Sequence, residues 1–161
     1  MGTLMLADKN EAWFLLKKAP TAYKKPVVAD FADAVNISDQ LFDDGSYLRP
    51  SGSETTKQPF ISGDQNESFG QDNFEGQVSV ALFSDADSEI WTALQAKGST
   101  AWIATRSLEA YDTDPAVDDL VSIFQVMSDT PQPPQSREGY QKRIIPLAVQ
   151  KAVVDVKVAA S

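Results

Sequence analysis

The last quarter of the chain constrains the fold more than any other part of the sequence. Four consecutive segments differ sharply in character: apolar at 120–127, proline-rich at 130–134, alternating at 139–147, and rich in Val and Ala at 152–158. Alternating β-branched residues predict strands, and clustered prolines favour a stiff, extended connector. In the final strand we expect Val154, Val156 and Val158 to share one face. The segment therefore predicts a β protein whose C-terminal half is a meander.

Upstream, further short segments carry the same β signature. We expect strands at 11–18, 36–42, 77–83 and 100–106, with a tight turn at Asp43-Asp44-Gly45 and a return strand that starts near Tyr47. One helix is expected at about 85–97, capped by Ser84 or Asp85, because apolar residues recur there at helical spacing.

Between these segments, residues from about 49 to 76 are rich in Ser, Thr, Gly, Asn and Gln. We interpret them as one long loop, partly extended around 59–61. A loop of this length in a compact domain is either functional or disordered. The functional alternative is a partner-binding loop that orders on assembly; the other is a solvated loop.

The elements together predict about seven strands and one helix. A mostly-β fold, a β-sandwich or barrel with the helix docked on one side, is the simplest arrangement of such elements. The sequence contains no interdomain linker, so we expect one domain over residues 1–161, with extended arms at either end left open.

Charge is distributed unevenly along the chain. The net charge is −9; residues 51–135 carry three basic and fourteen acidic groups, whereas residues 136–161 carry five basic and two acidic groups. A chain with this much negative charge is not expected to bind nucleic acid by neutralising its phosphates. The acidic middle is either a solvated surface or a surface that must not adhere to DNA. We expect no membrane partner and no signal peptide.

Candidate chemistry is sparse. The chain has no Cys and no His, which excludes thiolate nucleophiles, His bases and Cys/His zinc sites. Four aspartates in the 107–119 loop suggest a calcium site but miss the EF-hand spacing, so a solvated acidic loop is the alternative; they are Asp112, Asp114, Asp118 and Asp119. We assign no catalytic, cofactor-binding or metal-binding residue, expect no cofactor, and infer that the protein is not an enzyme.

Other polar and aromatic residues have plain structural interpretations. Lys142 and Arg143 should point to opposite faces of a strand, one of them pairing with an acidic neighbour or both discouraging edge aggregation. Trp13, Trp91 and Trp102 are interpreted as core residues rather than sugar-stacking platforms.

Several motifs resemble, in order, those of the major tail tube proteins of long, non-contractile-tailed bacteriophages, especially those that infect actinobacteria. They cover the chain from about residue 36 to its end: Asn36-Ile-Ser-Asp-Gln-Leu-Phe42, Ser53-Glu-Thr-Thr56, Asn73-Phe-Glu-Gly-Gln-Val-Ser-Val80, the helix with Gly98, and Gly139-Tyr-Gln-Lys-Arg-Ile-Ile-Pro-Leu147. Two departures leave the shape of the 107–119 loop open. Relatives often have Arg-Arg-x-Gly where this chain has Arg106-Ser107-Leu108, and Gly-Asp where it has Asp118-Asp119.

The resemblance implies a virion protein that forms stacked hexameric rings, with sheets joined around each ring into an inner barrel. It implies partners as well: copies of itself, the tape measure protein, the tail terminator and tip proteins, tail assembly chaperones, and double-stranded DNA that passes without specific binding. The implied location is the virion tail, with the host cytoplasm during assembly. The alternatives are another phage or secretion-tube structural protein, such as a terminator or decoration protein, and a carbohydrate-binding or carboxylate-dependent hydrolytic β-sandwich.

Overall fold

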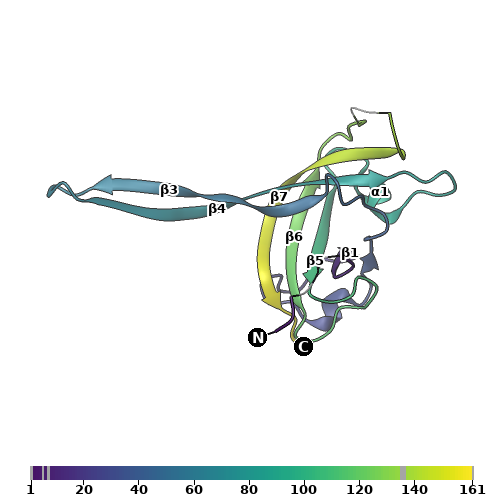
Figure 1. The fold of residues 1–161 in the computed structure, drawn as a ribbon, viewed down its shortest axis with the longest axis horizontal. Helices are drawn as coiled ribbons and strands as arrows, with labels where there is room; N and C mark the ends of the chain where they lie inside the picture. The colour runs from purple at the N-terminus through teal and green to yellow at the C-terminus, as the bar shows by residue number, and fades with distance from the viewer. Residues whose placement is uncertain (1, 5, 7, 135–136, 161) are drawn as a thin grey trace.

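The computed structural model describes residues 2–4, 6, 8–134 and 137–160. Over these residues it contains one seven-stranded antiparallel sheet in the order β2-β1-β5-β6-β7-β4-β3 (Figure 1). The elements in chain order are β1 (Glu11–Leu16), the 3-10 helix η1 (Val28–Phe31), β2 (Val35–Asn36), β3 (Tyr47–Pro59), β4 (Gln65–Ala81), α1 (Glu89–Leu94), β5 (Thr100–Ser107), β6 (Leu120–Ser128) and β7 (Lys142–Lys157). The predicted mostly-β class is confirmed.

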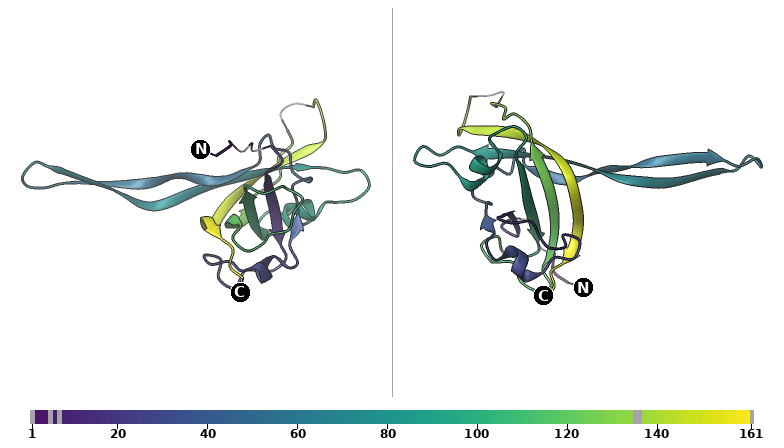
Figure 2. Two further views of the ribbon diagram at one scale, coloured as in Figure 1. Left: turned by 60° about the horizontal axis from the view of Figure 1, so that its bottom comes forward. Right: turned by 180° about the vertical axis from the view of Figure 1, so that it is seen from behind.

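The sheet is twisted and almost closed by the segment that follows β2 (Figure 2). At one end of this segment the Ile37 N–H donates to the Trp13 carbonyl of β1, at 2.9 Å. At the other end the Phe42 N–H donates to the Ser79 carbonyl of β4, also at 2.9 Å. Residues 37–42 thus connect both sides of the sheet, and the barrel-like form of the predicted architecture is the one observed.

Each face of the sheet buries its own apolar cluster, because successive side chains of a strand alternate between faces. Leu15 belongs to the inner cluster, which α1 covers with Ile90 and Leu94. Its neighbours Phe14 and Leu16 belong to the outer cluster, which is covered by Phe31 of η1. The central strands β5 and β6 contribute to both clusters, so they read as nearly continuous apolar segments.

The predicted loop at 49–76 is wrong. Its residues form most of a long hairpin, β3 paired with β4, and only the turn between Pro59 and Gln65 lies outside the strands. The error has a physical cause. Beyond its root the hairpin has no apolar core to cover on either face, so its sequence lacks the alternation that marks a half-buried strand.

The predicted helix is shorter than expected, since α1 spans six residues rather than 85–97. Ser88, not Ser84 or Asp85, is the N-cap, and its hydroxyl oxygen accepts from the Trp91 N–H. Contacts from distant segments fix both ends. The Gln40 side chain accepts from the Ile90 N–H, and the Ser128 hydroxyl donates to the Ala96 carbonyl.

The two strands predicted at 139–147 and 152–158 are a single strand, β7. Two irregularities in its pairing with β6 each insert one extra residue, and Asp155 adopts a left-handed conformation with φ of 53°. The second bulge changes which side chains share a face. Val156 and Val158 share the outer cluster as predicted, but Val154 is exposed and Val153 packs on that cluster instead, so the prediction is wrong for Val154.

The strand predicted at 36–42 is also wrong in extent, because β2 ends at Asn36 and only an isolated bridge joins Leu41 to Val80. The other predicted strands lie within a few residues of β1, β5 and β6, and 77–83 overlaps the end of β4. The turn at 43–45 is present, with Gly45 at φ of 93°.

Candidate assembly surfaces

The outer part of the β3–β4 hairpin projects far from the rest of the molecule (Figure 1). Strand β4 pairs with β7 only over residues 76–81, so at residues 65–75 its one partner is β3. Both outer edges of this ribbon therefore present backbone N–H and C=O groups that no other strand of the described chain pairs. Free edges of this kind are templates for pairing with another chain.

The hairpin ends in an ordered, apolar turn. The Phe60 N–H donates to the Asp64 carbonyl at 2.7 Å, and the Gly63 N–H donates to the Phe60 carbonyl at 3.0 Å. The side chains of Phe60 and Ile61 nevertheless point into solvent, with relative exposures of 59% and 109%. Phe69, further back on β4, is exposed as well. Apolar groups gathered at the end of a projection are typical of a surface that another chain covers.

The root of the hairpin is held rigidly. The Gln77 amide donates to the Gly45 carbonyl at 2.9 Å, and the Ser46 hydroxyl accepts from the Ser79 N–H at 2.9 Å. Gly76 lies so close to Leu48 that a β-carbon at this position would collide with the leucine Cδ2 atom. The projection therefore leaves the sheet in a defined direction.

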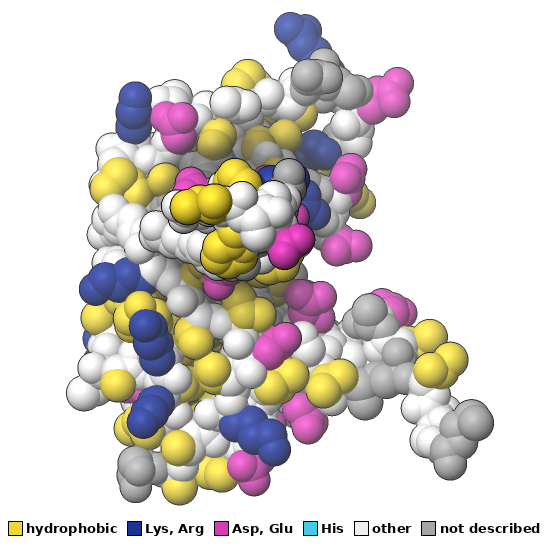
Figure 3. Space-filling view, turned by 90° about the vertical axis from the view of Figure 1, so that its left-hand side faces the viewer, with side chains coloured by type: hydrophobic (Ala, Val, Ile, Leu, Met, Phe, Trp, Pro, Cys, Tyr) yellow, Lys and Arg dark blue, Asp and Glu magenta, His cyan; other side chains and the backbone are white. Residues whose placement is uncertain are grey.

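Next to the root lies a groove of about 570 Å³, which we call the acidic groove. Aromatic side chains of Trp13, Phe42 and Tyr47 line it. Four charged residues line it as well: Asp8, Lys9, Glu11 and Asp43. Viewed along the hairpin, Asp and Glu side chains gather to the right of the body below the hairpin, and Lys and Arg along its left border (Figure 3).

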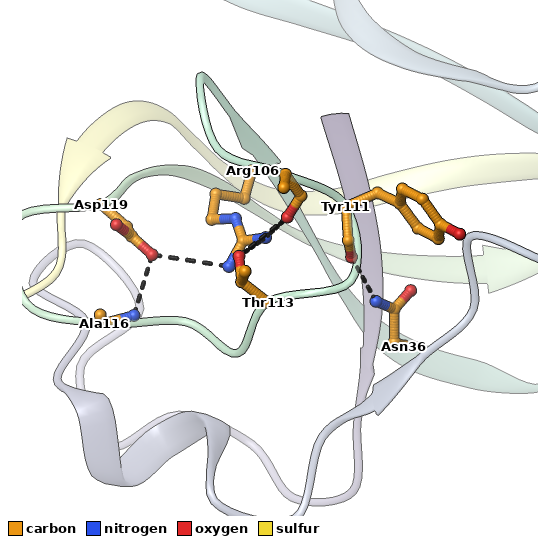
Figure 4. Close-up of polar contacts among 7 residues, drawn as sticks. Asn36, Arg106, Tyr111, Thr113, Ala116 and Asp119 are labelled. Carbon is orange, nitrogen blue, oxygen red and sulfur yellow. Dashed lines mark hydrogen bonds and ion pairs between the residues drawn. The ribbon is translucent and has the colours of Figure 1, made fainter. Parts of the chain in front are cut away.

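The end of β5 carries a buried charge that sequence reasoning missed, and its polar partners lie in the connection to β6 (Figure 4). Arg106 is fully buried, and its Nη2 donates to the Ala110 carbonyl at 2.8 Å and to the Thr113 hydroxyl at 3.0 Å. Its Nη1 lies 3.5 Å from Asp119 Oδ2, and Asp119 also accepts from the Ala116 N–H. The available signal was the alternation of the strand, which places Arg106 on the same face as Ala104 and Trp102, because an arginine on an apolar face must have a polar partner.

Arg106 holds part of the acidic loop through these contacts. One of its four aspartates, Asp119, is engaged by the arginine, and the loop is tied further by the Asn36 amide, which donates to the Tyr111 carbonyl at 2.6 Å. Within the described residues, no group of three or more acidic side chains is arranged to hold a metal ion. The two departures from the resemblance, Leu108 and Asp118, both adopt left-handed backbone conformations, with φ of 72° and 69°.

The other residues that the sequence singled out, the three tryptophans with Lys142 and Arg143, contact neighbouring parts of the fold. Each tryptophan is half-buried, with Trp13 and Trp91 against the inner cluster and Trp102 against the outer one, which confirms their role in packing. The exposed tryptophans that a carbohydrate-binding surface requires are therefore lacking. The Lys142 Nζ lies 5.8 Å from the centroid of the Phe42 ring, and Arg143 donates to the Lys142 carbonyl.

One carboxylate links α1 to the segment that closes the barrel. A hydrogen bond from its own backbone N–H and a second from the Gln40 amide, at 2.7 Å, lower the pKa of Glu89, with a further small contribution from Lys17. Within the described residues, no helix is long and apolar enough to cross a membrane.

The fixed root, free strand edges and apolar tip of the β3–β4 hairpin are features of a structural β protein whose surfaces contact other chains. The comparison with protein families agrees with this class, since the family described as phage tail tube protein matches residues 1–161. The chain belongs to the phage tail tube family and is a structural protein of the virion tail. A comparison with curated proteins gave no match.

Proposed function

We propose that this protein assembles into hexameric rings that stack into the tail tube, the conduit through which DNA leaves the capsid. The observation that carries the proposal is the β3–β4 hairpin. An isolated two-stranded ribbon is only marginally stable in water, so a hairpin this long is expected to gain its stability by pairing with other chains.

The reach of the hairpin suits contact between rings. Strand β3 has 13 residues, and a strand rises by about 3.3 Å per residue, so the hairpin extends over about 40 Å. Its tip cannot fold back onto its own body, because the root is fixed by Gly76 and the 43–46 turn. Phe60 and Ile61 would therefore meet a copy in the adjacent ring, and such a head-to-tail contact propagates an open polymer.

Electrostatics favour passage of DNA without binding. The net charge of −9 gives the assembled protein a predominantly acidic surface, and phosphate groups gain no counterion release from it. Edge-to-edge pairing of the sheets around a ring removes exposed strand edges and would produce the barrel wall.

The proposal includes the rest of the assembly that the family implies. Residues 1–161 act as one tail tube domain, which meets the tape measure protein within the tube and the terminator and tip proteins at its ends. Tail assembly chaperones act in the host cytoplasm, before the protein enters the tail. No catalytic residue or cofactor is part of this function.

Electron microscopy of the purified protein, alone at high concentration and with the tape measure protein, tests the proposal. We expect rings or tubes from the wild-type protein. Because Phe60 and Ile61 are exposed, Phe60→Ser with Ile61→Ser should leave the fold intact and should prevent stacking into tubes.

The matched control is Val117→Ser, which removes an apolar side chain of similar exposure, 48%, from a different loop. It should assemble as the wild-type protein does. A wild-type protein that stays monomeric under every condition, with or without the tape measure protein, would overturn the proposal.

A further inference from the structure

A second charged surface lies on the face of the sheet opposite the acidic groove. The Tyr23 ring packs on Trp102, with 5.7 Å between ring centroids. The ammonium groups of Lys24 and Lys151 lie 5.9 and 6.0 Å from the centroid of the same tyrosine ring. With Lys25, these residues form what we call the lysine–aromatic patch.

The patch is presented by ordered backbone. The Lys25 N–H donates to the Ala22 carbonyl at 2.9 Å, which closes a turn around Tyr23 and Lys24. Lys151 and Trp102 share a face, because each is the cross-strand partner of Gln125 on β6. Tyr23 and Trp102 both pack against the outer cluster, so the patch belongs to the outer face of the sheet.

The lysines of the patch lack counterions within the described chain. Residues 12–29 contain four lysines and no acidic residue. No carboxylate of the described residues lies within 4.0 Å of the ammonium groups of Lys24, Lys25 or Lys151. An uncompensated positive surface in a chain of net charge −9 indicates an acidic partner.

The acidic groove has the complementary properties. Asp8, Glu11 and Asp43 outnumber the single cation Lys9, and none of the three carboxylates forms an ion pair with a described residue. Two aromatic residues of the groove already have a cation of the same chain near their rings, with Arg49 4.3 Å from the centroid of Tyr47 and Lys142 5.8 Å from that of Phe42. Among the described residues Trp13 has no such neighbour, so its ring is the part of the wall that suits an incoming lysine, since ammonium groups bind favourably over aromatic faces. A volume of about 570 Å³ accommodates side chains of this size.

The two surfaces cannot meet within one molecule. Trp13, in the groove, packs against the inner cluster, whereas Trp102, in the patch, packs against the outer one. Below the hairpin in Figure 3, Lys and Arg side chains lie mainly toward the left and Asp and Glu side chains mainly toward the right. Complementary surfaces on opposite flanks make a heterologous contact, which closes into a ring when the rotation between copies allows it.

We propose that the lysine–aromatic patch of one copy docks in the acidic groove of the next copy within the same ring. This contact rests on the proposed tube function, and it is distinct from the hairpin contact between rings. It sets the direction of the ring, because neither surface can pair with a second surface of its own kind. It also makes ring formation sensitive to salt, since exposed charges are screened beyond about 10 Å at 0.1 M salt.

Charge reversal with rescue tests the proposal. Lys24→Glu with Lys151→Glu reverses the patch, and Glu11→Lys with Asp43→Lys reverses the groove. We expect each pair alone to raise the protein concentration needed for ring formation by more than about tenfold, because like charges then face each other. The fourfold variant should assemble again. Equimolar mixing of the two reversed proteins should also restore rings, in which the two proteins alternate.

Assembly is measured by sedimentation velocity and electron microscopy at about 50 mM and about 500 mM salt, where the weaker assembly expected at high salt reports on screening. Circular dichroism verifies the fold of each variant; Lys24, Lys151 and Glu11 are exposed, so folding should be unaffected. The control, Lys97→Glu with Lys157→Glu, makes the same change in net charge outside the patch and should assemble normally.

The outcomes separate this contact from the tube function. If the wild-type protein forms tubes and both reversed proteins assemble equally well, the ring contact is wrong and the tube function stands. The same conclusion follows if neither the fourfold variant nor the mixture recovers assembly. If the wild-type protein never forms rings or tubes, both proposals fail.

Discussion

The buried pair of Arg106 and Asp119 allows a sharp prediction about stability. Arg106 has no exposed surface, and two of its donors, Nε and Nη1, have no hydrogen-bond partner among the described residues. The nearby Asp119 carboxylate is therefore the main compensation for a buried positive charge. The perturbation is Asp119→Asn, which removes that charge while it keeps the size of the side chain and an acceptor for the Ala116 N–H.

The expected cost follows from the geometry. At 3.5 Å the ion pair is close, and the Asp119 side chain is only 10% exposed, so water screens it little. Loss of one partner of a buried pair typically costs about 3–5 kcal/mol, because the other charge stays buried without compensation. Replacement of both partners is far milder. Arg106→Met with Asp119→Asn should be more stable than Asp119→Asn alone by at least about 2 kcal/mol.

Urea denaturation of dilute, unassembled protein provides the measurement, with the free energy of unfolding taken from the midpoint at constant slope. The exposed pair of Arg49 and Glu75, with side-chain exposures of 59% and 43%, is the control. Glu75→Gln should cost less than about 1 kcal/mol. The reasoning is refuted if Asp119→Asn costs no more than Glu75→Gln, or if the double variant is less stable than Asp119→Asn.

Three further predictions concern other parts of the fold. Gly76→Ala should destabilise the protein by about 1–3 kcal/mol in thermal unfolding, because the new methyl group would collide with Leu48 at the hairpin root. The control, Gly70→Ala, introduces only ordinary contacts and should change stability by less than about 0.5 kcal/mol. Equal effects of the two substitutions would contradict the packing argument. Leu108→Gly should leave stability unchanged or raise it by up to about 1 kcal/mol, since glycine relieves the left-handed backbone at φ of 72° but adds entropy to the unfolded chain; a clear drop in melting temperature would contradict this. By NMR titration the pKa of Glu89 should fall below its ordinary value of 4.5, so its contribution to stability is present above that pH and is lost as the pH falls through the lowered pKa; a pKa at or above 4.5 would contradict the hydrogen bonding seen at α1.

The sequence located the strands correctly wherever the apolar pattern along the chain agrees with the burial of the side chains. Strands β1, β5 and β6 are rich in apolar residues that pack on one or both faces, and periodicity located them to within a few residues. The mostly-β class followed from the same signal. The hairpin escaped prediction because its outer strands cover no core, and polar strands of this kind cannot be told from a loop by pattern.

The candidate surfaces were even harder to predict from the sequence. The acidic groove brings residues 8–13 together with 38–48 and Thr105, and the lysine–aromatic patch joins residues 23–25 to β5 and β7. Such contacts depend on strand order and register. The partners of Arg106 could not be predicted for a similar reason. The loop conformation that brings Asp119 near it includes residues with a left-handed backbone that are not glycine, so the sequence carries no turn signal at those positions.

By itself, the amino-acid sequence determined the β class, the absence of Cys and His chemistry, the acidic balance and the ordered motifs of the tail tube family. These properties depend on composition and on neighbours along the chain. Only the tertiary structure decided that a polar stretch becomes a projecting hairpin, that β7 is one bulged strand, and that positive and negative surfaces lie on opposite faces. Those features depend on backbone pairing between distant segments, which side-chain pattern alone does not specify.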